Sequence, residues 1–111
     1  SLALAAGKPV PIRATSLART LGAPFATERT MAAARLFLDE ITVVSDREAA
    51  AALFAILDDE RLLVEPAAAC TLAAALRRKD SFAPDERIGL VLCGSNVALD
   101  DALGWRAQFN L

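Results

Sequence analysis

The segment Ala67–Leu76 carries no charged side chain, and this feature constrains the fold of the chain more than any other. Pro66 before it suits the first position of a helix, and the basic run 77–79 after it suits the negative end of the helix dipole. A helix that is apolar on every face must be covered on all sides. The 111 residues, 55% of them hydrophobic, can form one domain with a small core. We therefore expect this helix to belong inside a larger domain than the chain alone supplies.

Charge and cysteine content exclude several classes of function. The formal net charge is −2, without the basic stripe that nucleic acid requires. The longest apolar run, 62–76, contains Glu65 and Pro66 and is shorter than the roughly 20 residues that span a bilayer, so no membrane partner is expected. Cys70 and Cys93 occur without any histidine, which excludes a paired-cysteine zinc site and an imidazole-dependent mechanism. They are typical of the reduced thiols of a cytoplasmic protein.

Capping patterns predict helices along the chain. Ser45-Asp46-Arg47-Glu48 is a capping box and predicts a helix to about Leu57. Thr27 is expected to open an earlier helix, with Met31, Ala34 and Leu38 on its apolar side. A short helix through Thr20 is expected from a cap at Thr15 or Ser16, with Gly22 ending it at positive φ. The last helix is expected from near Val97, capped by Ser95 or Asn96, with Leu99, Leu103 and Phe109 as core contacts.

Short apolar or β-branched runs predict strands between these helices. Residues 9–12, 41–45 and 88–93 are expected to be extended, and 88–93 is uninterruptedly apolar, as in a parallel strand covered on both faces. Strands that alternate with helices indicate an α/β fold. The sequence therefore predicts a partial three-layer α/β/α domain with a mostly parallel sheet.

The turn Cys93-Gly94-Ser95-Asn96 is the strongest candidate for a binding site. It stands at the carboxyl end of a predicted parallel strand, where open α/β sheets bind ligands, and Gly94 allows a flat ligand to approach the backbone. By itself this pattern also fits an ordinary strand-to-helix turn with a glycine and a cap.

Three segments in this order, 44–48, 63–70 and 93–96, resemble the fold-type II pyridoxal-phosphate-dependent serine/threonine dehydratases. Upstream, 5–10 and 16–22 are also similar to that family, so the resemblance covers nearly the whole chain. It implies that residues 1–111 form the C-terminal portion of the large cofactor-binding domain, in an enzyme that converts L-serine or L-threonine to a 2-oxo acid and ammonia. It further implies a small amino-acid substrate, a homodimer, and a site completed by the remainder of the polypeptide.

The resemblance also implies roles for individual residues. Cys93 corresponds to the family's serine or cysteine beside the pyridine nitrogen of the cofactor, with Gly94 and Asn96 in the same turn. Glu65 corresponds to a glutamate that supports the loop near the ring, without transferring protons. Thr20 stands where the family has glycine or alanine against the ring face. The backbone carbonyls of Leu21 and Ala23 stand where some members bind a monovalent or divalent cation.

The sequence departs from the family's pattern at three places. Thr20 is bulkier than the family's residue, Ala68 and Ala69 stand where relatives usually keep a glycine, and Ser95 replaces the second glycine of the common Cys/Ser-Gly-Gly-Asn turn. Cys70 is expected to pack in the core, where a free cysteine behaves as a small hydrophobic residue.

The family's Schiff-base lysine, substrate-carboxylate loop and phosphate loop have no counterpart in these residues. Lys8 and Lys79 stand in polar surroundings, so no catalytic residue is predicted and the chain alone is expected to be inactive. Ser1 does not resemble a native N-terminus, and no regulatory domain is expected if Leu111 ends the protein. Two alternatives stay open: another fold-type II enzyme, such as a serine racemase or a threonine synthase, and a non-catalytic interaction module.

Overall fold

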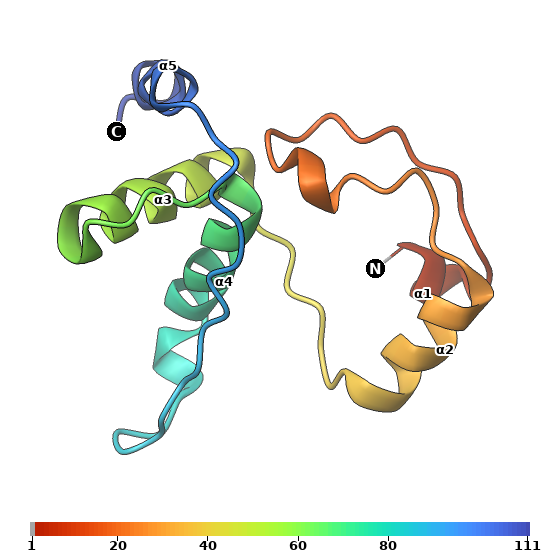
Figure 1. Cartoon of the computed structure of the whole chain (residues 1–111). Helices are drawn as coiled ribbons and strands as arrows, with labels where there is room; N and C mark the ends of the chain where they lie inside the picture. Colours follow the sequence, from red (N-terminus) through yellow and green to blue (C-terminus); the bar gives the residue numbers. More distant parts are fainter. Residues whose placement is uncertain (1) are drawn as a thin grey trace. The chain divides into compact units, whose positions relative to one another are not determined.

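The chain folds into helices joined by extended segments in the computed structural model, which describes residues 2–111 (Figure 1). The contacts divide it into two compact units, which we call the N-terminal unit, ending at Val43, and the C-terminal unit, Val44–Leu111. The N-terminal unit contains α1 (Leu2–Ala6), the 3₁₀ turn η1 (Arg19–Leu21) and α2 (Glu28–Phe37). The C-terminal unit contains α3 (Asp46–Glu60), α4 (Pro66–Arg77), the 3₁₀ turn η2 (Lys79–Ser81) and α5 (Leu99–Phe109).

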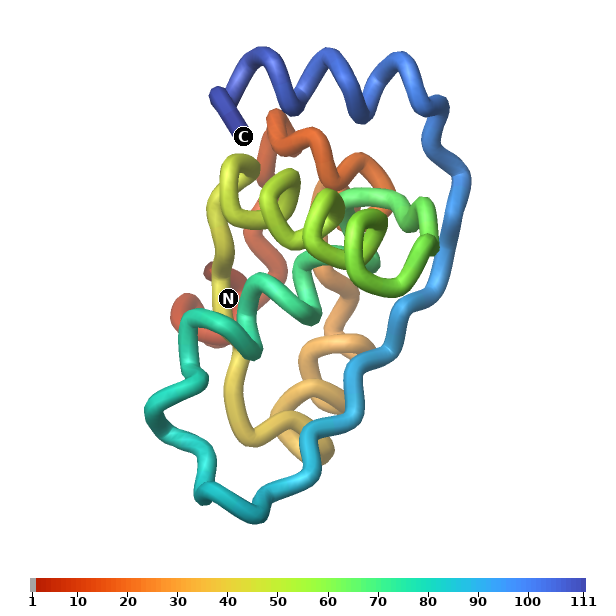
Figure 2. The backbone as a smooth tube through the Cα atoms, turned by 90° about the vertical axis from the view of Figure 1, so that its left-hand side faces the viewer, coloured from red at the N-terminus to blue at the C-terminus, as the bar shows by residue number. Residues whose placement is uncertain are grey.

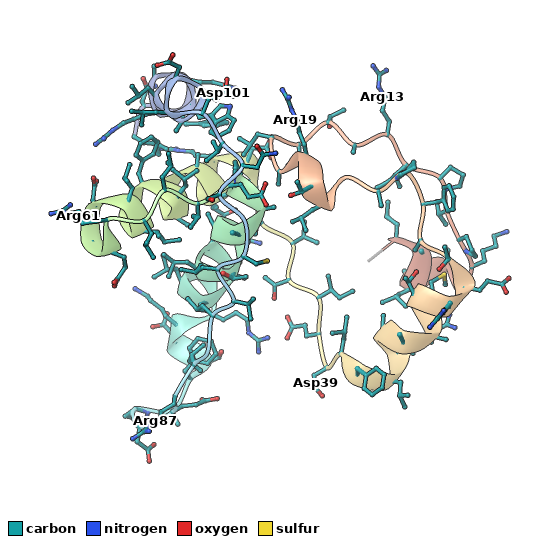
Figure 3. All side chains as sticks on the ribbon, viewed as in Figure 1. Arg13, Arg19, Asp39, Arg61, Arg87 and Asp101 are labelled. Atoms are coloured by element: carbon teal, nitrogen blue, oxygen red, sulfur yellow. The ribbon has the colours of Figure 1, made fainter. Side chains whose placement is uncertain are left out.

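The capping box at the start of α3 is confirmed. The Glu48 amide donates to Ser45 Oγ (3.3 Å), and the Glu48 carboxylate accepts from the Ser45 amide (2.7 Å). The helix runs one turn further than predicted and ends at Arg61, which adopts a left-handed conformation with φ of 58°. The Arg61 guanidinium donates to the Asp58 carbonyl, and its side chain points away from the unit (Figure 3).

The predicted start of α4 is also confirmed, with Pro66 at its first position and Glu65 as the N-cap residue. Helices α3 and α4 pack against each other, and α5 lies over one side of α3 (Figure 2). Leu53 is the largest fully buried side chain of their core. The other buried members of this core are Ala52, Phe54, Ile56, Val64, Ala68, Ala69, Ala73 and Ala102. Small alanines on both helices allow the close approach of α3 and α4.

The uniformly apolar helix is covered on part of its surface. Ala68, Ala69 and Ala73 are buried against α3, whereas Leu76 is 52% exposed. The last turn of α4 therefore stays accessible at Leu76, whereas residues 67–75 are at least partly buried.

The predicted sheet is not confirmed. Among residues 2–111, the segments 9–12, 41–45 and 88–93 form neither helix nor strand. Each runs as an irregular connection, and the segment after η2 returns from the far end of α4 to the start of α5 (Figure 1). The Glu65 amide donates to the Gly94 carbonyl (3.1 Å), a bond of the kind that joins neighbouring strands. A parallel strand needs a row of such partners, and one bond does not make a ladder.

Two helix ends differ from the predictions. The short helix near Thr20 is the single 3₁₀ turn η1, and Gly22 ends it at φ of −84°, so no positive φ is required there. Helix α5 begins at Leu99 with Ala98 as its N-cap residue, and neither Ser95 nor Asn96 caps it. The cap prediction was wrong because the extended path continues past Asn96 before the helix starts.

The core contacts predicted for α5 were wrong in part. Leu99 and Leu103 are exposed, while Ala102 is fully buried and Trp105 is half-buried against the core. The buried stripe of α5 is therefore displaced around the helix from the one that its large aliphatic residues indicate. In α2, Met31 is buried as predicted, but Leu38 lies just beyond the helix and is exposed.

Candidate functional site

The turn 93–96 lies at the end of the extended segment that precedes α5, and all four of its residues are exposed. Gly94 has φ of +95°, a backbone conformation that residues with a side chain rarely adopt. The Val97 amide donates to the Ser95 carbonyl (2.8 Å), which closes the chain into a tight turn directly after Gly94. The sequence signal for a special turn at this glycine therefore corresponds to a real backbone requirement.

Glu65 lies against this turn. Besides the bond from its amide to the Gly94 carbonyl, its side chain occupies the place that a side chain at position 94 would need. A Cβ atom on residue 94 would come within 2.7 Å of the Glu65 carboxyl carbon. The sequence suggested that Gly94 makes room for a flat ligand, but on this side the missing side chain makes room for Glu65. Residues 65 and 94 are thus brought together by both backbone and side chain.

The start of α4 explains why Glu65 is available for this contact. It is the N-cap residue of α4, yet its carboxylate makes no capping hydrogen bond to that helix. Pro66 follows at the first helical position, where its ring fixes the direction in which the chain enters the helix. The side chain of Glu65 lies against Gly94, which follows Cys93 in the chain.

The two cysteines differ in exposure. Cys93 is a free, exposed thiol, and Cys70, in the first turns of α4, is half-buried. Burial, and then the nearby negative charge of Asp46, raise the pKa of the Cys70 thiol. Cys70 therefore stays protonated and packs beside the core, close to the role expected for it. Cys93 is the thiol that a ligand can reach.

Three of the expected site residues belong to the N-terminal unit. Thr20 and Leu21 lie in η1, and Ala23 follows Gly22. All three of these residues are exposed. The Ile12 amide donates to the Pro24 carbonyl (2.8 Å) and fixes the path of the chain just after Ala23. Their part in the same site as Cys93 stays a prediction. Lys8 and Lys79 are exposed, as their polar surroundings indicated.

One interaction near the helix ends could not be found from the sequence. The Arg77 guanidinium, at the end of α4, binds both carboxylate oxygens of Glu48 at 2.6 Å. The hydrogen bonds from the Ser45 side chain and amide, followed by the bond from Arg77, lower the pKa of Glu48 to about 2. The capping box was visible as a local pattern, but nothing in the sequence marks Arg77 as its third member.

Each unit also has an open apolar hollow. In the C-terminal unit a hollow of about 320 Å³ is lined by Ala55, Ile56, Asp59, Glu60, Leu62, Leu72, Leu90 and Leu92. In the N-terminal unit a hollow of about 420 Å³ is lined by Leu2, Ala3, Val10, Ile12, Ala23, Phe25, Ala26, Thr27 and Thr30.

Within residues 2–111 no group of three histidine, cysteine or acidic side chains is arranged to hold a metal ion. No helix in the described part of the chain is long and apolar enough to cross a bilayer.

Comparison with known families gives one match over most of the chain. Residues 1–94 match the sequence model of a family described as "Pyridoxal-phosphate dependent enzyme". The matched residues include Glu65, Cys93 and Gly94, so the contact described above lies within the region that defines the family.

Individual relatives agree with this match. A "Serine dehydratase-like" protein of Rattus norvegicus is 39% identical over 97% of this chain and 36% of its own length. An "L-serine dehydratase/L-threonine deaminase" of Mus musculus is 33% identical over 98% of this chain and 36% of its own length. The crystal structure of a fungal L-serine ammonia-lyase from Rhizomucor miehei superimposes with a TM-score of 0.78, at 25% identity, over 97% of this chain and 36% of that one.

The chain thus spans little more than a third of the length of these proteins. Over that third its fold resembles that of the fungal enzyme.

Proposed function

The chain belongs to the family of pyridoxal-phosphate-dependent enzymes, and from this premise we propose that it forms the C-terminal part of the large domain of an L-serine/L-threonine dehydratase. In the complete protein the segments 9–12, 41–45 and 88–93 become parallel strands of a fold-type II, three-layer α/β/α domain. The remainder of the polypeptide supplies their partner strands, the catalytic lysine and the phosphate-binding loop. We further propose a homodimer located in the cytoplasm, where the thiols of Cys70 and Cys93 stay reduced.

The observation that carries this proposal is the contact between Glu65 and Gly94 directly beside the exposed thiol of Cys93. Glu65 and Gly94, which the family resemblance selects from two segments 29 residues apart, are in contact in the C-terminal unit, and Cys93 precedes Gly94 in the chain. A structural turn with an incidental glycine gives no reason for a carboxylate to lie over that glycine. Similarity to dehydratases and to an L-serine ammonia-lyase favours the reaction class.

The residues of the turn fit the ring nitrogen of pyridoxal phosphate. When bound, this cofactor supplies the electron sink for loss of the α-proton and the β-hydroxyl of the amino acid, after which water releases ammonia and the 2-oxo acid. The Cys93 thiol is exposed and uncharged when protonated, so it would hold the ring nitrogen through a hydrogen bond without fixing a positive charge on it. Asn96 and the Gly94 backbone would line the same edge of the ring.

Glu65 acts on the turn rather than on the substrate in this proposal. Its amide donates to the Gly94 carbonyl at 3.1 Å, and its side chain lies against the glycine on the side where a Cβ would stand. The roles of Thr20 at the ring face, and of the Leu21 and Ala23 carbonyls at a cation, are proposals that rest on the family resemblance alone.

The reaction is tested on the complete protein. Purified enzyme with pyridoxal phosphate is incubated with L-serine and with L-threonine, and release of the 2-oxo acid and of ammonia is measured for each. Release of both products supports the dehydratase assignment. Conversion of L-serine to D-serine without a 2-oxo acid would move the assignment to a racemase. A purified protein without the visible absorbance of a bound cofactor would overturn the proposal. The non-catalytic interaction module would then be the remaining alternative.

The role of Cys93 is tested separately. We expect Cys93→Ser to retain cofactor affinity, because the hydroxyl also forms a hydrogen bond with the ring nitrogen. Cys93→Ala should weaken the affinity by about three- to tenfold, the effect of one neutral hydrogen bond. Cys70→Ala is the matched control, since that thiol lies on α4 beside the core. An unchanged affinity in Cys93→Ala would contradict the assigned role.

A further inference from the structure

The turn that presents Cys93 is held between two attachments. Within it, the Gly94 carbonyl accepts from the Glu65 amide, which attaches the turn to the start of α4. After it, the chain passes through residues 97–98 and enters α5, which packs on α3 (Figure 2). The position of the turn therefore depends on where α5 lies, as well as on Glu65.

Helix α5 has little support of its own. Its N-cap residue, Ala98, offers no side-chain cap, and Gly104 interrupts its middle with open space around it. Leu99 and Leu103 are exposed, so only part of the helix contacts the core. A short helix with these features is marginal in isolation, so tertiary contacts with α3 must hold it in place.

The contact with α3 combines small apolar groups with one directional interaction. Ala102 is fully buried, and Trp105 lies half-buried against the same core. A small buried alanine fixes the distance between the two helices but allows α5 to rotate or slide. The Arg106 guanidinium lies over the ring of Phe54 on α3, 4.8 Å from the ring centre, in cation–π geometry. Phe54 is only 5% exposed, so this ring is otherwise enclosed by the core.

The position of Arg106 is fixed from its other side as well. Its Nε donates to the Leu111 carbonyl (3.3 Å), and the Leu111 amide donates to the Arg106 carbonyl (3.1 Å). The chain folds back at Asn110, which adopts a left-handed conformation. The guanidinium is thus held between the ring of Phe54 and this reversal of the chain.

We propose that Arg106 is a positioning residue for Cys93: stacked on Phe54, it fixes α5 against α3 and thereby sets the turn 93–96 at its place beside Glu65. The proposal rests on the proposed function for its consequence, the presentation of Cys93 to the ring nitrogen. The coupling between Arg106 and the turn is a property of the C-terminal unit alone and can be measured without the cofactor.

The test uses the complete protein with Arg106→Ala, Arg106→Lys and Phe54→Leu. Hydrogen exchange of the Glu65 amide reports directly on its bond to Gly94, and the alkylation rate of Cys93, in a Cys70→Ala background, reports on the turn. Arg106→Ala and Phe54→Leu should raise both rates by about two- to fivefold, the loss of one cation–π contact. Arg106→Lys keeps the positive charge and should restore part of the protection. Arg47→Ala removes an exposed arginine of α3 that makes no such contact, and should change neither rate.

A merely structural role predicts a different pattern. If Arg106→Ala leaves the Glu65 amide and the Cys93 thiol unchanged, the positioning role is wrong. If amides throughout α3 and α4 accelerate equally, Arg106 stabilises the unit as a whole and the proposal also fails. Cofactor affinity should fall in the variants in which the exchange rate of the Glu65 amide and the alkylation rate of Cys93 rise. A wild-type protein that binds no pyridoxal phosphate contradicts the proposed function, while the exchange and alkylation rates still decide the coupling.

Discussion

In the C-terminal unit, α3, α4 and α5 bury a continuous core around Leu53, whereas the N-terminal unit buries far less. Among the described residues before Val44, the buried hydrophobic residues are Ala18 and Met31. Leu36, Phe37 and Leu38 are exposed at the end of α2. The difference arises because α3, α4 and α5 cover one another, whereas much of the N-terminal unit is extended chain that buries little.

The strongest test of this comparison is Leu53→Ala. Leu53 is fully buried between α3 and its neighbours, and its truncation should lower the free energy of unfolding by about 3 to 5 kcal/mol. Leu36→Ala, at a residue that is 74% exposed, should change it by less than about 0.5 kcal/mol. Urea unfolding of both variants provides the measurement. Equal losses would show that the two units do not differ in the way described.

The next largest effect is expected at the turn. Gly94→Ala forces a side chain into φ of +95° and against Glu65, so it should cost about 1 to 3 kcal/mol. Gly89→Ala is the matched control, because a Cβ at that glycine meets no atom within 4 Å. Adding Glu65→Ala to Gly94→Ala relieves the crowding but leaves the backbone strain, so the stability should recover only in part. Full recovery of the stability would show that an alanine at position 94 adopts this φ without strain.

Helix caps allow a direct comparison of the two units. Ser45→Ala removes the cap of α3 and should cost about 1 kcal/mol in global unfolding, because α3 is the centre of its unit. Thr27 caps α2 by accepting from the Thr30 amide at 3.1 Å. Thr27→Ala should reduce the helical circular dichroism of α2 with a smaller effect on global unfolding, because α2 has few buried contacts. A larger global effect of Thr27→Ala would reverse the comparison.

The smallest effect is the pH dependence of the cap. Because the pKa of Glu48 falls from 4.5 to about 2 in the folded chain, its stabilisation is fully present above about pH 4.5. It is lost as the pH falls towards 2 and the carboxyl group becomes protonated. The stability difference between wild type and Glu48→Gln should therefore narrow between pH 5 and pH 2 in acid titrations of unfolding. A constant stability difference between pH 5 and pH 2 would mean that the charge of the Glu48 carboxylate does not stabilise the folded chain.

Local signals in the sequence predicted the starts of three helices, whereas α1 was not predicted and the predicted start of α5 was wrong. The capping box at Ser45 and Glu48, the proline at the start of α4 and the cap at Thr27 are patterns of neighbouring residues, and all three are confirmed. Distant contacts were not predictable in the same way. Arg77 and Phe54 carry no sequence mark for their partners Glu48 and Arg106, since those contacts exist only after the helices pack.

The strands and the site show the other limit. The apolar run 88–93 predicted a strand, but apolar composition supplies no hydrogen-bond partners, and no strand ladder is formed within residues 2–111. At the site, the resemblance selected Glu65 and Gly94 separately. Their contact depends on φ at Gly94 and on the direction of the chain at Pro66, which only the folded backbone determines.

The clamp of Ser45, Glu48 and Arg77 has a consequence for the order of folding. The bonds between Ser45 and Glu48 close over three residues, whereas Arg77 reaches Glu48 across 29. Short loops close far faster than long ones, so we expect the first turn of α3 to form before α4 docks. In folding kinetics, Ser45→Ala should then slow folding, with a φ-value well above that of Arg77→Ala, which should mainly speed unfolding. The Glu48 carboxylate is then already oriented by Ser45 when α4 docks and Arg77 binds it.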